Sequence, residues 1–162
     1  MNLRGPELLG RDHLLDGFDC GSPPLNDWLI RRALANQRSG ASRTWVVTDG
    51  DARRVVAYYA SATASIVRAA ATQRAARNQP SDVPALLLAR LAVDVSVAGR
   101  GVGAALLRHF LLKALEVAEL VGVRVVLVHA QDETARNFYL HYEFDPSPFD
   151  DLTLMRVVTD LR

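Results

Sequence analysis

Apolar residues recur at helical spacing in the first quarter of the chain. After Ser22 and two prolines, apolar side chains occupy positions 25, 28, 29 and 33, which is the i, i+3, i+4 spacing of one helix face. Serine is a favoured N-cap residue, and proline fits the first helical turn. The pattern predicts a helix that begins after Ser22 and ends near Gly40.

Two strands are predicted next, in residues 44–48 and 55–64, where β-branched and aromatic residues are frequent. The turn-forming sequence Asp49-Gly50-Asp51 separates them, so we expect an antiparallel hairpin. In residues 68–84, arginines are scattered among alanines, and Pro80 and Pro84 mark the end of the segment. This segment is interpreted as either a helix or a mobile connection.

The second half of the chain alternates apolar runs with helical patterns. Residues 85–94 and 123–130 are predicted to be buried strands, and residues 152–158 the last strand. A helix is expected from Ala104 to about Val121, with Gly122 as a left-handed C-cap. Asp132 is expected to cap another helix that runs to about Tyr142. The order predicts a single α/β domain over residues 1–162, in which helices cover a mixed sheet.

Composition narrows the class of protein. A chain of 162 residues can bury a core without disulfides or metal. The net charge of +1 argues against a protein that coats nucleic acid nonspecifically. Cys20 is the sole cysteine, which favours a reducing compartment. With no leader and no apolar run of bilayer length, we expect a soluble cytoplasmic protein that does not contact a membrane.

The chemistry is concentrated between residues 97 and 104, where three glycines connect a predicted strand to a long helix. Glycines allow a sharp turn that brings backbone amides close to a ligand, and the helix N-terminus favours an anion such as pyrophosphate. A Walker loop is excluded because Ala104 and Ala105 stand where Lys and Ser/Thr are required. The late position in the chain argues against a dinucleotide fold. A plain connecting turn is the alternative.

This segment resembles the signature of the GNAT acetyltransferases, Gln/Arg-x-x-Gly-x-Gly/Ala, which grips the pyrophosphate of acetyl-CoA. Gly101 and Gly103 match, whereas Ala98 stands where Gln or Arg is usual. The resemblance implies the GNAT fold of α+β type, with a mixed, mostly antiparallel sheet, flanking helices and splayed central strands. It implies acetyl-CoA as co-substrate and no metal. The implied cofactor-binding residues are Leu91, Ala92, Val93, Ala98, Gly99, Arg100, Gly101, Val102, Gly103, Ala104 and Asn137.

A second GNAT-like motif, Ala-x-x-Phe-Tyr, matches at Ala135, Phe138 and Tyr139, although Glu143 replaces a usual glycine a few residues later. In the family this tyrosine often protonates the departing coenzyme sulfur, so the resemblance implies that Tyr139 is the general acid. A backbone N–H near Val93 is the expected oxyanion donor. The alternative for Tyr139 is an aromatic side chain that only packs the helix.

Further segments narrow the resemblance to GNAT toxins of bacterial toxin–antitoxin pairs: residues 18–21, 25–29, 42–47, 56–60, 90–94 and 128–130. This implies acetylation of the α-amine of an aminoacyl-tRNA, inhibition of translation, a cognate ribbon-helix-helix antitoxin and a homodimer. Two alternatives stay open. One is a GNAT enzyme for a small amine, an antibiotic or a protein N-terminus, and the other is a non-catalytic binding module.

The expected substrate fits the ionisable residues of the chain. At pH 7 roughly a tenth of α-amines are neutral, a far larger fraction than for lysine side chains. An enzyme that acts on α-amines therefore requires no strong general base. Arg90 is the foremost candidate for a tRNA contact, with Arg43 and Arg77 beside it, although each is also explained as a solvated surface residue. His129 is a candidate proton relay, with a structural role as the alternative.

Overall fold

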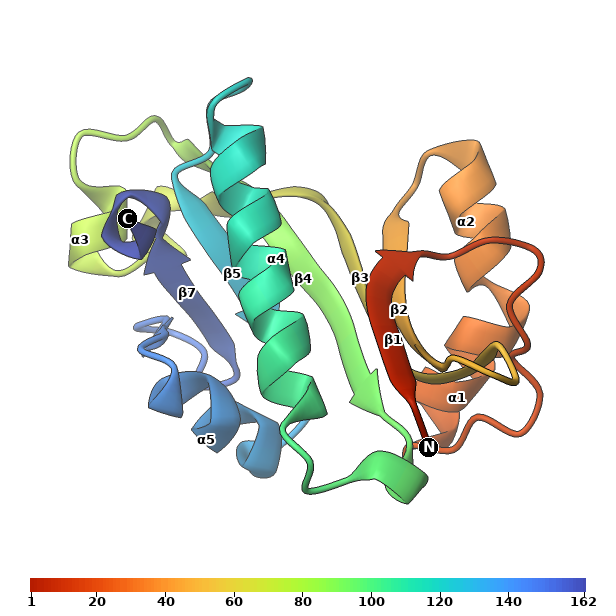
Figure 1. The fold of residues 1–162 in the computed structure, drawn as a ribbon. Coiled ribbons are helices and arrows are strands. Elements are labelled where there is room, and N and C mark those ends of the chain that lie inside the picture. The colour runs from red at the N-terminus through yellow and green to blue at the C-terminus, as the bar shows by residue number, and fades with distance from the viewer. The chain divides into compact units, whose positions relative to one another are not determined.

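In the computed structural model, which describes residues 1–162, the chain forms seven strands and five α-helices (Figure 1). The strands are β1 (Leu3–Leu8), β2 (Arg43–Asp49), β3 (Arg54–Val67), β4 (Asp82–Val93), β5 (Val125–His129), β6 (Asp145–Pro146) and β7 (Thr153–Val157). The α-helices are α1 (Pro23–Arg31), α2 (Ala33–Ser39), α3 (Gln73–Ala76), α4 (Val102–Ala118) and α5 (Glu133–His141). Single 3₁₀ turns occur at Arg68–Ala70, Val95–Val97 and Val158–Leu161.

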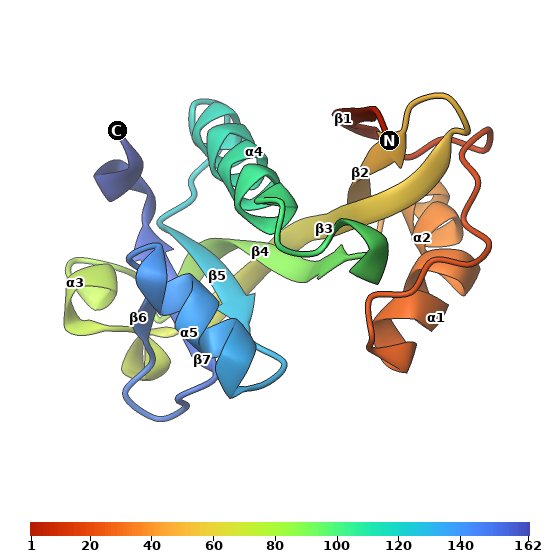
Figure 2. The ribbon, with the colours of Figure 1, turned by 60° about the horizontal axis from the view of Figure 1, so that its bottom comes forward.

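The strands form one sheet in the order β1-β2-β3-β4-β5-β7-β6. β2 pairs antiparallel with β1 and β3, and β7 pairs antiparallel with β5 and β6, whereas β4 and β5 run parallel (Figure 2). This confirms the predicted α/β class with a mixed, mostly antiparallel sheet. The splaying of the central strands stays a prediction.

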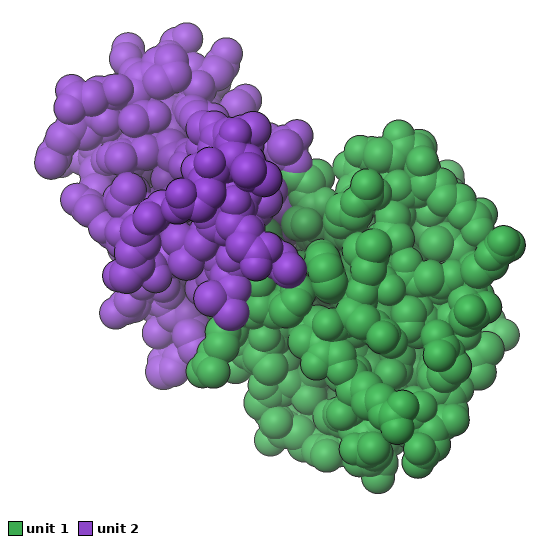
Figure 3. Space-filling model, turned by 45° about the horizontal axis from the view of Figure 1, so that its top comes forward, with its two compact units in different colours: residues 1–62, 89–110 green, residues 63–88, 111–162 purple.

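The chain divides into two compact units (Figure 3). Unit 1 comprises Met1–Ala62 and Ala89–Phe110, and unit 2 comprises Thr63–Leu88 and Leu111–Arg162. The long elements β3, β4 and α4 each contribute residues to both units. The prediction of one domain over residues 1–162 stays a prediction.

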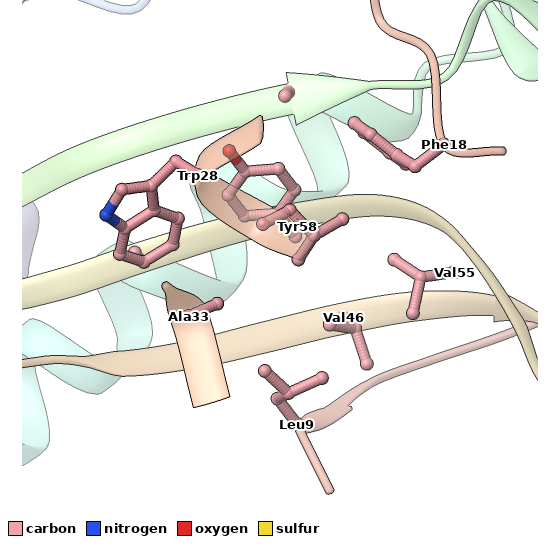
Figure 4. Close-up of a cluster of buried hydrophobic side chains, with 10 residues drawn as sticks. Leu9, Phe18, Trp28, Ala33, Val46, Val55 and Tyr58 are labelled. Atoms are coloured by element: carbon pink, nitrogen blue, oxygen red, sulfur yellow. The ribbon is translucent and has the colours of Figure 1, made fainter. Parts of the chain in front are cut away.

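The core of unit 1 lies where α1 and α2 pack against β2 and β3 (Figure 4). Trp28 stacks on Tyr58 with ring centroids 5.9 Å apart, and Phe18 meets the same ring edge-on at 5.6 Å. The Tyr58 hydroxyl donates a hydrogen bond of 2.7 Å to the Leu25 carbonyl, so its burial leaves no unpaired polar group. Helix α1 is thereby fixed to β3.

The core of unit 2 forms on one face of β5 and β7, where Leu127 and Met155 pack against Ala75 of α3. Because side chains alternate along a strand, the neighbouring Val126 and Val128 point to the other face, and they are also buried. Both faces of β5 are therefore covered. This explains why the strand reads as an unbroken apolar run rather than an alternating one.

The predicted first helix is two helices, because Arg32 leaves the helical conformation with φ −123° and ψ −30°. Gly40 caps α2 at φ 84°, as predicted. The Gln37 side chain donates to the Leu9 carbonyl at 2.7 Å and accepts from the Thr44 amide at 3.0 Å. These two bonds hold α2 beside the start of β2.

Other predicted boundaries were wrong. Helix α4 begins at Val102, two residues earlier than expected, and ends at Ala118. Gly122 is not among the residues with positive φ, so it is not a left-handed C-cap. Residues 68–84 hold a 3₁₀ turn and the short α3 before β4 begins at Asp82. Strand β1 was missed because its side chains are mostly exposed and do not alternate, and β6 because it has two residues.

No helix combines the length and the apolar character that crossing a bilayer requires.

Replacing Leu29 by alanine tests the unit 1 core. Leu29 is fully buried, and truncating such a leucine costs about 2–5 kcal/mol of unfolding free energy. Urea unfolding followed by circular dichroism measures the loss. The adjacent Ile30→Ala is the control, since Ile30 is 41% exposed, and its loss should stay below about 1 kcal/mol. Equal losses for the two variants would contradict the assigned packing.

Candidate active site

The glycine loop lies in unit 1 between β4 and α4. Gly99 and Gly101 have φ of 77° and 76°, a left-handed conformation that glycine adopts without steric cost. A Cβ atom at either position would meet nothing within 4 Å. The conformation, not crowding, therefore requires glycine here, and space for a ligand remains beside the backbone.

The loop is anchored at its ends and exposed between them. Val97 is fully buried and Val102 nearly so, whereas Ala98, Gly99, Arg100 and Gly101 are exposed. The first helical bond of the loop runs from the Ala105 amide to the Gly101 carbonyl, at 3.1 Å. Helix α4 therefore presents its first unpaired amides beside the exposed glycines, which is the arrangement that binds a phosphate group.

Gly103 and Ala104 differ from the other predicted loop residues because both lie inside α4. The amides of positions 102–104 belong to the first helical turn, where no carbonyl four residues earlier lies within the helix. The residues predicted to hold the cofactor along β4 are Leu91, Ala92 and Val93, the last three of that strand. Asp94 and the 3₁₀ turn Val95–Val97 separate them from the loop.

A buried carboxylate fixes the junction between β4 and the loop. Asp94 accepts hydrogen bonds from the Asp19 amide and the Ser96 amide, each at 2.9 Å, and Arg54 lies 3.9 Å away. Desolvation alone would raise the pKa of Asp94, but these amides, the Ser96 hydroxyl and Arg54 lower it below its usual value. Sequence reasoning missed this role, because Asp19 and Asp94 are 75 positions apart.

In unit 2, α5 carries Tyr139. The Asp132 side chain caps the helix by accepting a hydrogen bond of 2.8 Å from the Ala135 amide, as predicted. The Tyr139 ring is 5% exposed and lies against Phe138 and Phe144, with centroids 5.1 and 5.5 Å away. Burial raises the pKa of the Tyr139 phenol, so the group stays protonated at neutral pH.

The residues around Tyr139 explain one departure from the family motif. Glu143 has φ 70°, the left-handed conformation that the more usual glycine accepts most easily. Its carboxylate accepts a hydrogen bond of 3.0 Å from Arg156 of β7, which holds the residue in place. Asn137, the other predicted residue of α5, is exposed two positions before Tyr139.

The three arginines predicted to meet tRNA differ in their surroundings. The Arg90 guanidinium lies 4.2 Å above the Trp28 ring, a cation–π contact that orients it. Arg43 is exposed and donates a hydrogen bond of 2.9 Å to the Gln37 carbonyl. Arg77 is exposed at the end of α3. Arg43 and Arg90 belong to unit 1, and Arg77 belongs to unit 2.

Neither metal nor thiol chemistry finds support in the side chains. No group of three or more His, Cys, Asp or Glu residues could hold a metal ion. Burial raises the pKa of the Cys20 thiol, which opposes the thiolate that a nucleophile requires.

Known proteins share this architecture along nearly the whole chain. A tRNA-acetylating toxin of Mycobacterium tuberculosis is 46% identical over 146 residues, covering 90% of this chain and 86% of the relative. The structure of AtaT complexed with acetyl-methionyl-tRNAfMet superposes with a TM-score of 0.89 at 26% identity and covers 99% of this chain and 96% of that one.

A tyrosine-to-phenylalanine mutant of the AtaT toxin, bound to the C-terminus of the antitoxin AtaR and to acetyl-CoA, superposes with a TM-score of 0.83. Its identity is 25%, and the match covers 99% of this chain and 96% of that one. Residues 40–146 also match the description of the acetyltransferase (GNAT) domain. That match spans more than half of the chain and includes the glycine loop, so the chain belongs to the GNAT acetyltransferase family.

Proposed function

We propose that this chain is a toxin that transfers the acetyl group of acetyl-CoA to the α-amine of an aminoacyl-tRNA and thereby blocks translation. The observation that carries the proposal is the 46% identity to a tRNA-acetylating toxin over 90% of the chain. The structural similarity to AtaT in complex with acetyl-methionyl-tRNAfMet agrees with it.

The backbone amides of the glycine loop bind the pyrophosphate of acetyl-CoA. Gly99 and Gly101 turn the exposed backbone beside the N-terminus of α4, where helix amides and the helix dipole favour an anion. Ala98, Arg100, Val102, Gly103 and Ala104 complete the loop. Because backbone amides make the grip, Ala98 at the position of a usual Gln or Arg does not abolish it.

The strand before the loop and helix α5 supply the remaining contacts. When bound, acetyl-CoA supplies the thioester carbonyl that the amine attacks. Leu91, Ala92 and Val93 line the acyl end, with a backbone N–H near Val93 aimed at the developing oxyanion. Asn137 of α5 is a further cofactor contact. Such donors are already in place before the charge develops, which is why they lower the barrier.

Tyr139 donates its proton to the departing coenzyme sulfur. The ring contacts support this role, because Tyr139 packs against Phe138 and Phe144 and its phenol is thereby oriented. A phenol that stays protonated at neutral pH is an effective acid for a thiolate that forms during the reaction.

The acceptor is an α-amine at the end of a polyanion. Arg90, held over the Trp28 ring, contacts the tRNA near the acyl site, and the exposed Arg43 and Arg77 contact phosphates further away. Guanidinium groups pair with phosphates in a bidentate manner. We therefore expect acetylation to weaken as salt is added, because counterions compete for the phosphates.

The partners follow from the same relatives. A cognate antitoxin inhibits the chain, as the complex of AtaT with the C-terminus of AtaR suggests, and we infer that it is of the ribbon-helix-helix type. We also infer a homodimer in the cytoplasm, where charged tRNA is found.

A translation assay tests the function directly. Purified protein added to a cell-free translation reaction should stop protein synthesis only when acetyl-CoA is present. Intact-mass analysis of charged tRNA from the reaction should show the addition of one acetyl group. Inhibition without acetyl-CoA, or inhibition with unmodified charged tRNA, would favour a binding module over an acetyltransferase.

Replacing Gly101 by alanine tests the pyrophosphate site. Alanine at φ 76° costs about 1–2 kcal/mol, and relief of that strain moves the amides away from the phosphate. Calorimetry should show a Kd for coenzyme A about 10-fold higher, which corresponds to about 1.4 kcal/mol. Gly40→Ala is the matched control, because Gly40 has φ 84° but caps α2. It should lose comparable stability while its affinity for coenzyme A stays unchanged.

Replacing Tyr139 by phenylalanine tests the acid. We expect kcat for acetylation to fall by about 100-fold, the lower end of general-acid contributions, while the Kd for acetyl-CoA changes less than about 2-fold. Tyr142→Phe, on the residue after α5, is the control and should keep the full rate. A Tyr139→Phe enzyme with an unchanged kcat would restrict the tyrosine to packing.

A further inference from the structure

A chain of hydrogen bonds ends at His129, the last residue of β5. His129 Nδ1 lies 3.0 Å from the Thr153 hydroxyl, and that hydroxyl donates a bond of 2.9 Å to Asp150 Oδ2. The other oxygen of Asp150 accepts a bond of 2.9 Å from the Leu152 amide. Three side chains from β5, β7 and the turn before β7 are therefore connected in series.

Counting the protons in this series of hydrogen bonds shows which ring nitrogen of His129 carries a proton. An ionised carboxylate can only accept, so the single proton of the Thr153 hydroxyl points to Asp150. The hydroxyl oxygen must then accept a hydrogen bond from His129, which places a proton on Nδ1. In the neutral ring the lone pair is left on Nε2, and the His129 side chain is exposed. Nε2 can therefore accept a proton from a bound substrate.

Asp150 is suited to support a positive charge on His129. Its pKa is lowered mainly by the Leu152 amide and the Thr153 hydroxyl, while desolvation opposes them and the charge of His129 adds a smaller lowering effect. When His129 takes up a proton at Nε2, the ionised Asp150 carboxylate, linked to the ring through Thr153, stabilises the positive charge. Charged residues close in sequence to these groups include Asp132, which caps α5, and Asp151, whose carbonyl accepts a bond of 2.9 Å from Arg136 Nε.

Backbone bonds hold the three groups in position. The Ala130 amide bonds to the Leu152 carbonyl at 2.6 Å, and the Thr153 amide bonds to the Asp150 carbonyl at 3.1 Å. Thr153 is 7% exposed and pairs with His129 across the antiparallel strands. The histidine is thus oriented by buried and paired neighbours, as a proton acceptor must be if its geometry is to be ready before the substrate arrives.

His129 and Tyr139 belong to the same compact unit, with His129 at the end of β5 and Tyr139 on α5, the helix that follows it in the chain. Val128 pairs with Leu88 of β4, and His129 is the next residue of β5.

We propose that His129 Nε2 accepts a proton from the α-ammonium group of the aminoacyl-tRNA, with Thr153 and Asp150 as positioning residues. This step rests on the proposed function. The neutral amine forms the C–N bond, the C–S bond breaks with its electron pair on sulfur, and sulfur takes the Tyr139 proton. The new amide nitrogen then loses one proton, which restores the phenol, and His129 releases the first proton to water.

The test compares His129→Gln with the wild type across pH, using acetyl-CoA and a charged tRNA. About a tenth of an α-amine is neutral at pH 7, so loss of the proton acceptor should lower kcat/KM about 10-fold there. At pH 9 the amine is already neutral, and the two rates should agree within about 2-fold. Thr153→Val should follow the same pH dependence, and Thr153→Ser, which keeps the hydroxyl, should lose less.

Controls separate this role from folding and from the proposed function. His141→Gln makes the same change at an exposed histidine of α5 and should keep the wild-type pH profile. Thermal unfolding and calorimetry with coenzyme A verify the fold of each variant. A loss of equal size at pH 7 and pH 9, or no loss at either pH, would overturn the proposal for His129. A wild-type protein unable to acetylate any charged tRNA would instead refute the proposed function.

Discussion

The buried carboxylate of Asp94 is the interaction on which the cofactor site depends. It stands where β4 ends and the chain must change from an extended strand to a loop, and it satisfies two backbone amides there, those of Asp19 and Ser96. The Asp94 amide in turn bonds to the Val56 carbonyl of β3, and the Val95 amide to the Asp19 carbonyl. The start of the glycine loop is therefore fixed by its bonds to the sheet and to the segment before α1. A flexible loop needs such an anchor if its amides are to stay aligned.

Two elements of the site share a design in which the functional group is exposed while its support is buried. The glycine loop is held by Val97 and Val102. His129 is held by Thr153, and Thr153 by Asp150. Tyr139, the proposed proton donor, differs because its ring is buried. The proposed proton acceptor, His129, needs an accessible lone pair, and its side chain is exposed.

The sequence allowed those features to be predicted that rest on local signals. Gly40 at the end of α2 and Asp132 at the start of α5 have the roles that their residue types favour. The glycine loop was also located from its composition and its neighbours. The contacts of Asp94 with Asp19 and of His129 with Thr153 were not predictable, because they join positions that are 75 and 24 residues apart. Periodicity carries no information about such pairs.

Backbone preferences also failed in one instructive place. Gly122 follows a long helix but does not adopt positive φ, whereas Glu143 does, at 70°. At Gly122 the chain leaves α4 through amides that bond back to Glu116 and Val117, which already pairs part of the helix end. At Glu143 the carboxylate is held by Arg156. A tertiary partner therefore supports the conformation of Glu143 against the local preference, whereas the bonds that end α4 are local.

The stacking of Arg90 on Trp28 restricts the directions from which this cation can be approached. With the indole against one flat side, an incoming oxygen reaches the N–H groups only along the guanidinium rim. Trp28 itself stacks on Tyr58 of the unit 1 core. The guanidinium, the indole and the phenol ring are therefore stacked in series. A lysine at this position would have no planar group to stack on the indole, so the direction of its ammonium group would be less restricted.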